Sequence, residues 1–131
     1  MKTYDDVYKT AGAFSWNELV TSDPKAAAEF YGGLFGWTFD NMDMGPGGTY
    51  RVIKTGATSV GGVMKTPEQA GSMPPAWGSY VTVADVDATL KKVSALGGRV
   101  IVPPMDVPKV GRMAVIADPQ GATLNVIQYV G

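Results

Sequence analysis

The 131-residue chain contains no histidine and no cysteine. Without histidine it lacks the side chain whose ordinary pKa lies closest to neutrality, and nucleophile pairs of the Ser-His and Cys-His kind are excluded. A transition-metal site would have to be built from carboxylates and neutral oxygens, which bind zinc, nickel or iron poorly. We therefore expect no metal and no other cofactor. The absence of cysteine also fits a cytoplasmic compartment.

The sequence also lacks a dominant charge and a long apolar run. It has 11 Lys and Arg residues against 12 Asp and Glu residues, for a formal net charge of −1. A nucleic-acid partner needs a basic patch that neutralises phosphates, and a membrane span needs about 20 apolar residues. Residues 1–12 do not contain the apolar segment of a signal peptide. We expect neither a nucleic-acid nor a membrane partner, and we predict a cytoplasmic protein.

What the sequence does contain is one pattern that occurs twice. The chain is long enough for one domain with a core and too short for two ordinary domains. We therefore predict a single domain, residues 1–131, built from two modules, residues 14–66 and 77–130, with a Pro-rich linker at 67–76. Four residues recur at one shift of 62 positions: Asp23 as Asp85, Ala26 as Ala88, Leu34 as Leu96 and Gly36 as Gly98.

Each copy of the pattern predicts a helix that follows a strand. Asp23 and Asp85 are candidate N-caps, because a carboxylate can accept hydrogen bonds from the free amides of a first helical turn. Each cap is followed by apolar residues at helical spacing, which predicts one stripe facing a core. The first stripe is Ala27, Phe30, Tyr31 and Leu34, and the second is Val86, Leu90 and Val93.

The remaining apolar segments predict strands. In Phe14 to Val20, alternation places Trp16 and Glu18 on one face and Leu19 on the other, under the helix. The pair Gly61-Gly62 inside a strand indicates a bulge or a close approach of another group. Expected strands after the helices are 36–42, 49–54, 58–65, 99–102, 111–117 and 122–129, with a second initial strand at 77–84 and a loop at 103–108.

Several of these pieces together resemble the vicinal oxygen chelate superfamily, which includes the glyoxalase I, bleomycin-resistance and extradiol dioxygenase families. The resemblance implies an α+β fold of two βαβββ modules. Their mixed or antiparallel sheets would curl into a cup with the helices outside and a ligand cavity inside. The matching pieces are Trp16-Asn-Glu-Leu, Phe30-Tyr31, Leu34-Phe-Gly-Trp37, Asp85-Val-Asp87, Leu96-Gly-Gly98, Val110-Gly-Arg112 and Asp118-Pro-Gln-Gly121.

The resemblance also locates where a metal would bind. Members with metal-dependent chemistry have a His in the first strand of each module and a Glu in the last strand. The corresponding residues here are Trp16, Gly78 and Asn125. Trp16 and Gly78 have no donor side chain and Asn125 has only a neutral oxygen, so we expect the fold without its metal.

A cup without metal would still have an inner face with polar groups among apolar ones, as small-molecule sites do. Met64 and Met113 would add adaptable apolar surface. The alternative is that these side chains are ordinary core, that Asn125 satisfies a backbone group, and that Glu18 is simply hydrated. Strand alternation assigns to the inner face Trp16, Glu18, Tyr80, Thr82 and Asn125.

These observations are consistent with three functions. The first is a protein of the glyoxalase and bleomycin-resistance type that binds a small organic molecule in the cup without metal. The second is a metal-independent lyase or isomerase in which Glu18, its pKa raised by an aromatic wall, is the general base. The third is a regulatory or partner-binding module whose cup is filled by its own side chains. The resemblance also implies a homodimer.

Overall fold

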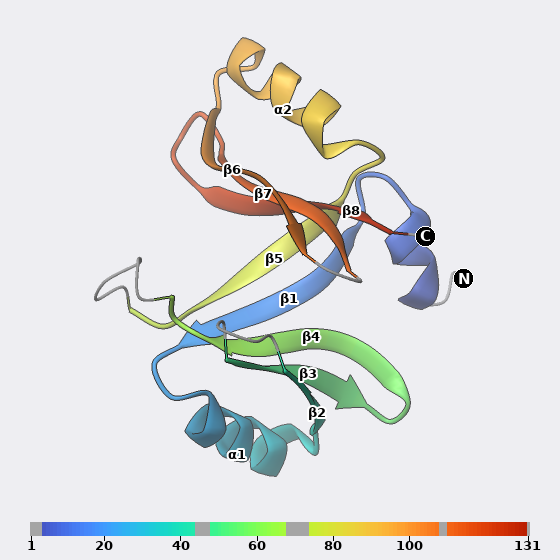
Figure 1. Cartoon of the computed structure of the whole chain (residues 1–131), viewed down its shortest axis with the longest axis vertical. Helices are drawn as coiled ribbons and strands as arrows, with labels where there is room; N and C mark the ends of the chain where they lie inside the picture. The colour runs from blue at the N-terminus through green and yellow to red at the C-terminus, as the bar shows by residue number, and fades with distance from the viewer. Residues whose placement is uncertain (1–3, 44–47, 68–73, 108–109, 131) are drawn as a thin grey trace. The chain divides into compact units, whose positions relative to one another are not determined.

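The computed structural model describes residues 4–43, 48–67, 74–107 and 110–130. The chain divides into two compact units (Figure 1). One is continuous, Trp16–Gly78, and the other combines Met1–Ser15 with Ser79–Gly131. Most of the predicted linker, residues 67–76, lies outside the described residues, and the proposed module boundaries stay a prediction. None of the helices described is long and apolar enough to cross a membrane.

The first module has the order strand, helix and three strands. Its strands are adjacent in the order β2-β3-β4-β1, with β1 and β4 parallel and the other neighbours antiparallel. The predicted βαβββ arrangement is thus confirmed for this half. Its elements are β1 (Phe14–Thr21), α1 (Pro24–Phe35), β2 (Thr38–Asp43), β3 (Thr49–Thr55) and β4 (Thr58–Lys65).

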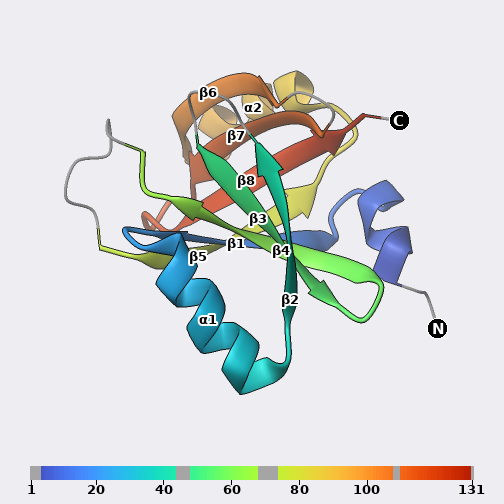
Figure 2. The same cartoon turned by 60° about the horizontal axis from the view of Figure 1, so that its bottom comes forward.

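Helix α1 begins where the sequence predicts. The Asp23 carboxylate accepts a hydrogen bond from the Ala26 amide at 3.0 Å, and Pro24 is at the start, where its missing N–H costs nothing. Gly36 ends the helix in the left-handed conformation, with φ 74°. The helix lies beside the strands of its own unit (Figure 2).

The first module's core lies between α1 and one face of its strands. Leu19, Ile53 and Val63 are buried there, and Ala27 and Tyr31 of α1 pack against them. Leu19 therefore lies under the helix as predicted. The predicted apolar stripe is wrong for its other two members, because Phe30 and Leu34 are exposed. The strands therefore cover only part of this stripe.

The second module repeats the order strand, helix and three strands. Its strands are adjacent in the order β5-β8-β7-β6, with β5 and β8 parallel and the other pairs antiparallel. The second βαβββ module is likewise confirmed. Its elements are β5 (Ala76–Thr82), α2 (Val86–Ala95), β6 (Arg99–Val107), β7 (Gly111–Ala117) and β8 (Thr123–Tyr129).

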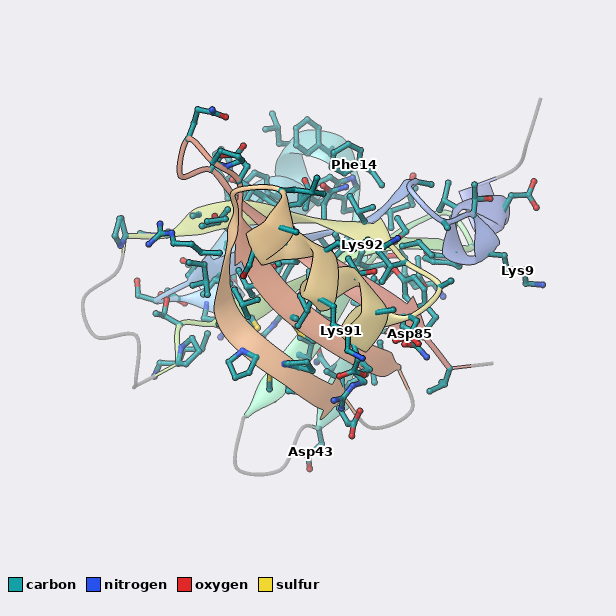
Figure 3. All side chains as sticks on the ribbon, turned by 90° about the horizontal axis from the view of Figure 1, so that it is seen from above. Lys9, Phe14, Asp43, Asp85, Lys91 and Lys92 are labelled. Carbon is teal, nitrogen blue, oxygen red and sulfur yellow. The ribbon has the colours of Figure 1, made fainter. Side chains whose placement is uncertain are left out.

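Helix α2 covers one face of these strands. The Asp85 carboxylate accepts from the Ala88 amide at 3.1 Å, as the repeat predicts. The whole predicted stripe faces the core: Val86 and Val93 are buried, and Leu90 packs against Val86 and its neighbours. The outer side of α2 has charged residues, of which Lys91 and Lys92 are labelled in Figure 3.

The loop predicted at 103–108 is wrong for residues 103–107, and Pro108 lies outside the described residues. Strand β6 continues through Pro103 and Pro104 to Val107, and its register with β7 shifts between Val102 and Met105. Proline has no N–H to donate to a neighbouring strand, so it is tolerated at the edge of a sheet or at a bulge. Strand β6 is the last in its half's order and has such a bulge, so it meets both conditions.

The segment before β1, which we call the arm, contains a short helix. Residues Tyr4–Lys9 form a 3-10 helix, η1. Thr82 of β5 binds this segment through three groups: its amide donates to Ala13 O, its carbonyl accepts from the Gly12 amide, and its hydroxyl donates to Val7 O, all at 2.8 Å. The arm is therefore joined to a strand that lies far along the chain.

The family motif residues of the second module are structural. The Arg112 guanidinium on β7 donates two hydrogen bonds to the Asp87 carboxylate, at 2.9 and 3.1 Å, and a third to Asp106 on β6 at 3.0 Å. The Asp118 carboxylate accepts from the Gln120 and Ala122 amides and so closes the turn before β8. Arg112 thereby joins α2 to the edge of the sheet.

The change Asp87→Asn should lower stability at neutral pH and have no effect in strong acid. The hydrogen bond from Arg112 holds the pKa of the Asp87 carboxyl below its ordinary value of 3.8. The folded state then binds that proton less tightly than the unfolded state. The stabilisation is therefore fully present above about pH 4 and is lost as the pH falls through the lowered pKa. Urea unfolding of parent and variant from neutral pH to about pH 2 measures the difference.

The difference in unfolding free energy between the parent and Asp87→Asn should also shrink at about 1 M salt, because the Arg112–Asp87 ion pair is exposed to solvent. Lys54→Gln, which breaks the ion pair with Asp40 in the other module, is the control for a general salt effect. If the difference in unfolding free energy between Asp87→Asn and the parent stayed constant down to pH 2, the proposed role of the carboxylate charge would be contradicted.

Candidate functional site

Trp16 and Glu18 lie on the face of β1 that points away from α1, and Tyr50 of β3 joins them. The Trp16 Nε1–H donates to the Tyr50 hydroxyl at 2.9 Å. That hydroxyl donates to Glu18 Oε2 at 2.7 Å. An indole N–H can only donate, so the tyrosine oxygen accepts from Trp16 and its own hydrogen is directed to the carboxylate. We call these three residues the Trp-Tyr-Glu row.

The glycine pair in β4 makes room for this row. Glu18 and Gly62 are direct neighbours in the parallel pairing of β1 with β4. A Cβ at Gly62 would collide with the Tyr50 ring, and one at Gly61 would collide with the Asn17 carbonyl. The antiparallel register with β3 also shifts beside this pair, after Ile53. Gly61-Gly62 predicted either a bulge or a close approach of another group, and the structure has both: the register shift with β3, and the Tyr50 ring and Asn17 carbonyl against the glycines.

The surroundings of Glu18 combine partial burial with a strong donor. Both Trp16 and Glu18 are half-buried. Burial disfavours a charged carboxylate, whereas a hydrogen bond donated to it favours the charge. Tyr50 thus holds the carboxylate in one orientation.

Met64 belongs to the same face. It pairs with Val20 on β1, two positions beyond the pairing of Glu18 with Gly62, and alternation in a strand returns a side chain to the same side after two residues. It is half-buried. The first unit therefore brings together three of the residues predicted from the sequence: Trp16, Glu18 and Met64.

In the second unit, three other predicted residues share the face opposite α2. Tyr80 on β5 is paired with Asn125 on β8. The Tyr80 hydroxyl approaches the Met113 sulfur at 3.8 Å. The Asn125 amide donates to the Ser79 carbonyl at 3.2 Å. Asn125 therefore satisfies a backbone group, which is one of the two roles predicted for it. Tyr80 is buried, so its ring is held in place.

Thr82 is placed differently from its neighbours. Its side chain is buried and its hydroxyl donates to the Val7 carbonyl. It also lines a pocket of about 250 Å³ between η1 and the start of α2. Thr82 therefore fixes the arm, and its role toward a ligand stays a prediction. The pocket is lined by Tyr8, Lys9, Ala11, Thr82, Val83, Ala84, Gln128 and Tyr129.

Two of the residues that the resemblance places at metal-ligand positions are engaged within the protein. Trp16 directs its N–H to Tyr50, and the amide nitrogen of Asn125 is engaged with Ser79. Within residues 4–43, 48–67, 74–107 and 110–130, no three His, Cys, Asp or Glu side chains gather as metal ligands would. A hard cation would need several oxygen ligands, and a soft one would need imidazole or thiolate.

Tyr50 is the site residue that the sequence did not reveal. It lies in a strand where tyrosine is ordinary, and 32 residues separate it from Glu18. The available signal was indirect: Gly62 predicted that something would approach β4, and the structure identifies the Tyr50 ring as that group.

The change Gly62→Ala should destabilise the first module and break the Trp-Tyr-Glu row. The new methyl group would occupy the position of the Tyr50 ring, and overpacking of this kind costs about 1–3 kcal/mol. Urea unfolding measures the loss, and near-ultraviolet circular dichroism reports the displaced aromatic rings.

Gly33→Ala is the matched control, because nothing lies within 4 Å of its Cβ position. In a helix it should stabilise by about 0.4–1 kcal/mol. Equal effects of the two changes would rule out close packing at Gly62.

Curated proteins of similar sequence have different descriptions. The chain is 44% identical over 117 residues to "Putative glyoxylase CFP32" of Mycobacterium bovis, a match that covers 89% of this chain and 44% of the relative. It is 42% identical over 129 residues to "Anthracycline biosynthesis protein DnrV" of Streptomyces peucetius, covering 88% of this chain and 46% of the relative. The chain thus spans about half the length of these relatives.

Solved structures share the fold at low sequence identity. Methylmalonyl-CoA epimerase from Mycobacterium tuberculosis superposes with a TM-score of 0.69 at 14% identity, over 92% of this chain and 89% of that one. A hypothetical protein, BH1468 from Bacillus halodurans, gives 0.71 at 12% identity, over 93% and 97%. At this level of identity the likeness concerns the fold alone. Residues 13–126 match the model of one family, and the chain therefore belongs to the Glyoxalase/Bleomycin resistance protein/Dioxygenase superfamily.

Proposed function

We propose that this protein binds a small organic molecule against the sheet face opposite α1, without a metal. The observation that carries the proposal is the Trp-Tyr-Glu row, a fixed carboxylate beside two aromatic side chains. Small-molecule sites combine apolar walls with a few polar groups in this way. The Tyr80, Asn125 and Met113 cluster of the second unit has a similar composition.

The chemistry of the row restricts the ligand. Tyr50 directs its hydrogen to Glu18, so the carboxylate is the group that would accept from a ligand, which must then have a hydroxyl or N–H donor. The indole and phenol rings favour a flat apolar body. A hydroxylated polycyclic ligand meets both requirements. The 42% identity to an anthracycline biosynthesis protein supports this class, and the "Putative glyoxylase" relatives support a smaller carbonyl compound.

Catalysis by Glu18 is the second candidate. A carboxylate that accepts from Tyr50 is held in one orientation, as a general base must be. It would take a proton from the ligand and later return it, which corresponds to an isomerase or lyase without metal. Turnover that depends on pH and requires Glu18 would support this candidate, whereas binding with no turnover supports sequestration.

The change Glu18→Gln should weaken ligand binding and leave the fold intact. It keeps the shape of the side chain and removes the charge, and a hydrogen bond to a charged group contributes about 1.5–3 kcal/mol. We therefore expect the dissociation constant to rise by roughly 10- to 100-fold. Calorimetric titration with a hydroxylated anthraquinone and with a 2-oxoaldehyde measures this rise for both ligand classes. Tyr50→Phe, which removes the donor that orients Glu18, should weaken binding to a smaller extent.

Glu29→Gln is the control, because it makes the same substitution on the exposed side of α1. It should leave every affinity unchanged. If Glu18→Gln bound each ligand that the parent binds with equal affinity, Glu18 would be a hydrated surface residue and the proposed site would be wrong.

Metal analysis tests the other half of the proposal. Protein purified without added metal should contain no stoichiometric zinc, nickel, iron or manganese, because the resemblance places Trp16, Gly78 and Asn125 at the ligand positions, and none of them is a good ligand for these metals. Ligand affinity should also be the same before and after treatment with a chelator. Elemental analysis that finds close to one transition metal per chain, together with loss of binding in chelator, would overturn the metal-free proposal.

A further inference from the structure

An ion pair lies on the same sheet face as the Trp-Tyr-Glu row. Phe39 of β2 and Ile53 of β3 are paired and pack in the core under α1. The residues that follow them, Asp40 and Lys54, are therefore directed to the opposite face, because strand side chains alternate. The Lys54 ammonium lies 3.3 Å from Asp40 Oδ2. The row thus shares its face with one positive and one negative side chain of the outer two strands.

Lys54 is the one cation that the described residues of β1 to β4 place on this face. Arg51 is paired with Val63, which belongs to the core under α1. Lys65 follows Val63 by two positions in β4, and alternation returns it to the same side. An anionic group that approaches the Trp-Tyr-Glu row therefore meets a single positively charged partner.

The two members of the ion pair differ in how far the protein covers them. The Lys54 side chain is 28% exposed, whereas that of Asp40 is 67% exposed. The stem of Lys54 is thus held against the sheet, while Asp40 can turn to solvent. An ion pair with a largely exposed partner contributes little to stability, because water and salt screen it. A carboxylate from outside can therefore replace Asp40 at the ammonium at small cost.

The separation of Lys54 from Glu18 suits an elongated ligand. Glu18, Gly62 and Val52 are paired in succession across β1, β4 and β3, and Lys54 is two residues beyond Val52. With strands about 4.8 Å apart and a rise of about 3.3 Å per residue, the Cα atoms of Glu18 and Lys54 are about 12 Å apart. Val52 is half-buried and provides an apolar floor between the two charges.

We propose that Lys54 determines ligand specificity by binding an anionic group, and that the ligand is a hydroxylated aromatic acid. This inference rests on the proposed binding function. Glu18 accepts from a hydroxyl group at one end of the ligand, and the Lys54 ammonium donates to a carboxylate at the other end. Asp40 is then a competitor for the same ammonium, and it also repels the carboxylate of the ligand.

Two ligands that differ only in a carboxyl group test the role of Lys54. One is a dihydroxyanthraquinone with a carboxylate at the end remote from its hydroxyl groups, and the other is the same compound without the carboxyl group. Calorimetric titration should find that the parent protein binds the acid about tenfold more tightly, the lower end for a hydrogen bond between charged groups, because the Asp40 contact is given up. Lys54→Gln should abolish this preference. Lys54→Arg should retain it, because the charge remains.

The second partner of the ion pair separates ligand binding from a structural role. Lys54→Gln and Asp40→Asn break the same ion pair, so a purely structural effect would be alike in both. If Lys54 binds the anion, Asp40→Asn should instead increase the preference for the acid by about threefold, since a competing carboxylate is removed. Lys65→Gln is the matched control, because it removes a positive charge from the α1 side of the same strands, and it should leave the preference unchanged.

Three results would contradict the role of Lys54: equal affinity of the parent for the two ligands, a change of the same sign in Lys54→Gln and Asp40→Asn, or an equal loss of preference in Lys65→Gln. If the parent binds both ligands equally and Glu18→Gln weakens both, the proposed function stands and only the role of Lys54 is wrong. If the parent binds neither ligand, the proposed polycyclic ligand class and the role of Lys54 are both wrong.

Discussion

Each module has only one helix, and that helix can cover only one face of a four-stranded sheet. Leu19, Ile53 and Val63 under α1, and Val86, Ala114 and Val126 at α2, form the two apolar cores. Because strand side chains alternate, every residue beside these core positions is directed to the opposite face. The Trp-Tyr-Glu row and the Tyr80, Asn125 and Met113 cluster occupy those opposite faces. The position of the candidate site therefore follows from the way each helix is buried.

The residues that make the family recognisable are mainly structural. Asp23 and Asp85 cap the helices, Arg112 joins Asp87 to Asp106, and Asp118 closes a turn. These contacts are all made within the protein and do not involve a ligand, so members with different ligands can share them. The same motif therefore identifies the fold and leaves the chemistry undetermined, in agreement with the unlike names of the two groups of relatives.

Sequence reasoning succeeded where a structure depends on residues close in the chain. The caps at Asp23 and Asp85 act within three residues, and alternation alone places Leu19 under α1. It could not find Tyr50, whose partner Glu18 is 32 residues away. It also placed Phe30 and Leu34 in the core, because helical spacing indicates the side of α1 that faces the sheet but not how much of that side the strands cover. The proline-containing part of β6 was missed because edge position is a property of the whole sheet.

The three hydrogen bonds between Thr82 and residues 7–13 affect the order in which the chain can fold. The unit Trp16–Gly78 is continuous, so during synthesis on the ribosome all of its residues become available before the other unit is complete. Residues 7–13 are made well before their partner Thr82, and Tyr8 is made well before Tyr129, whose ring it contacts. The arm must wait, unpaired, while more than half of the chain is synthesised. Its docking closes a long loop and is therefore expected among the late steps of folding.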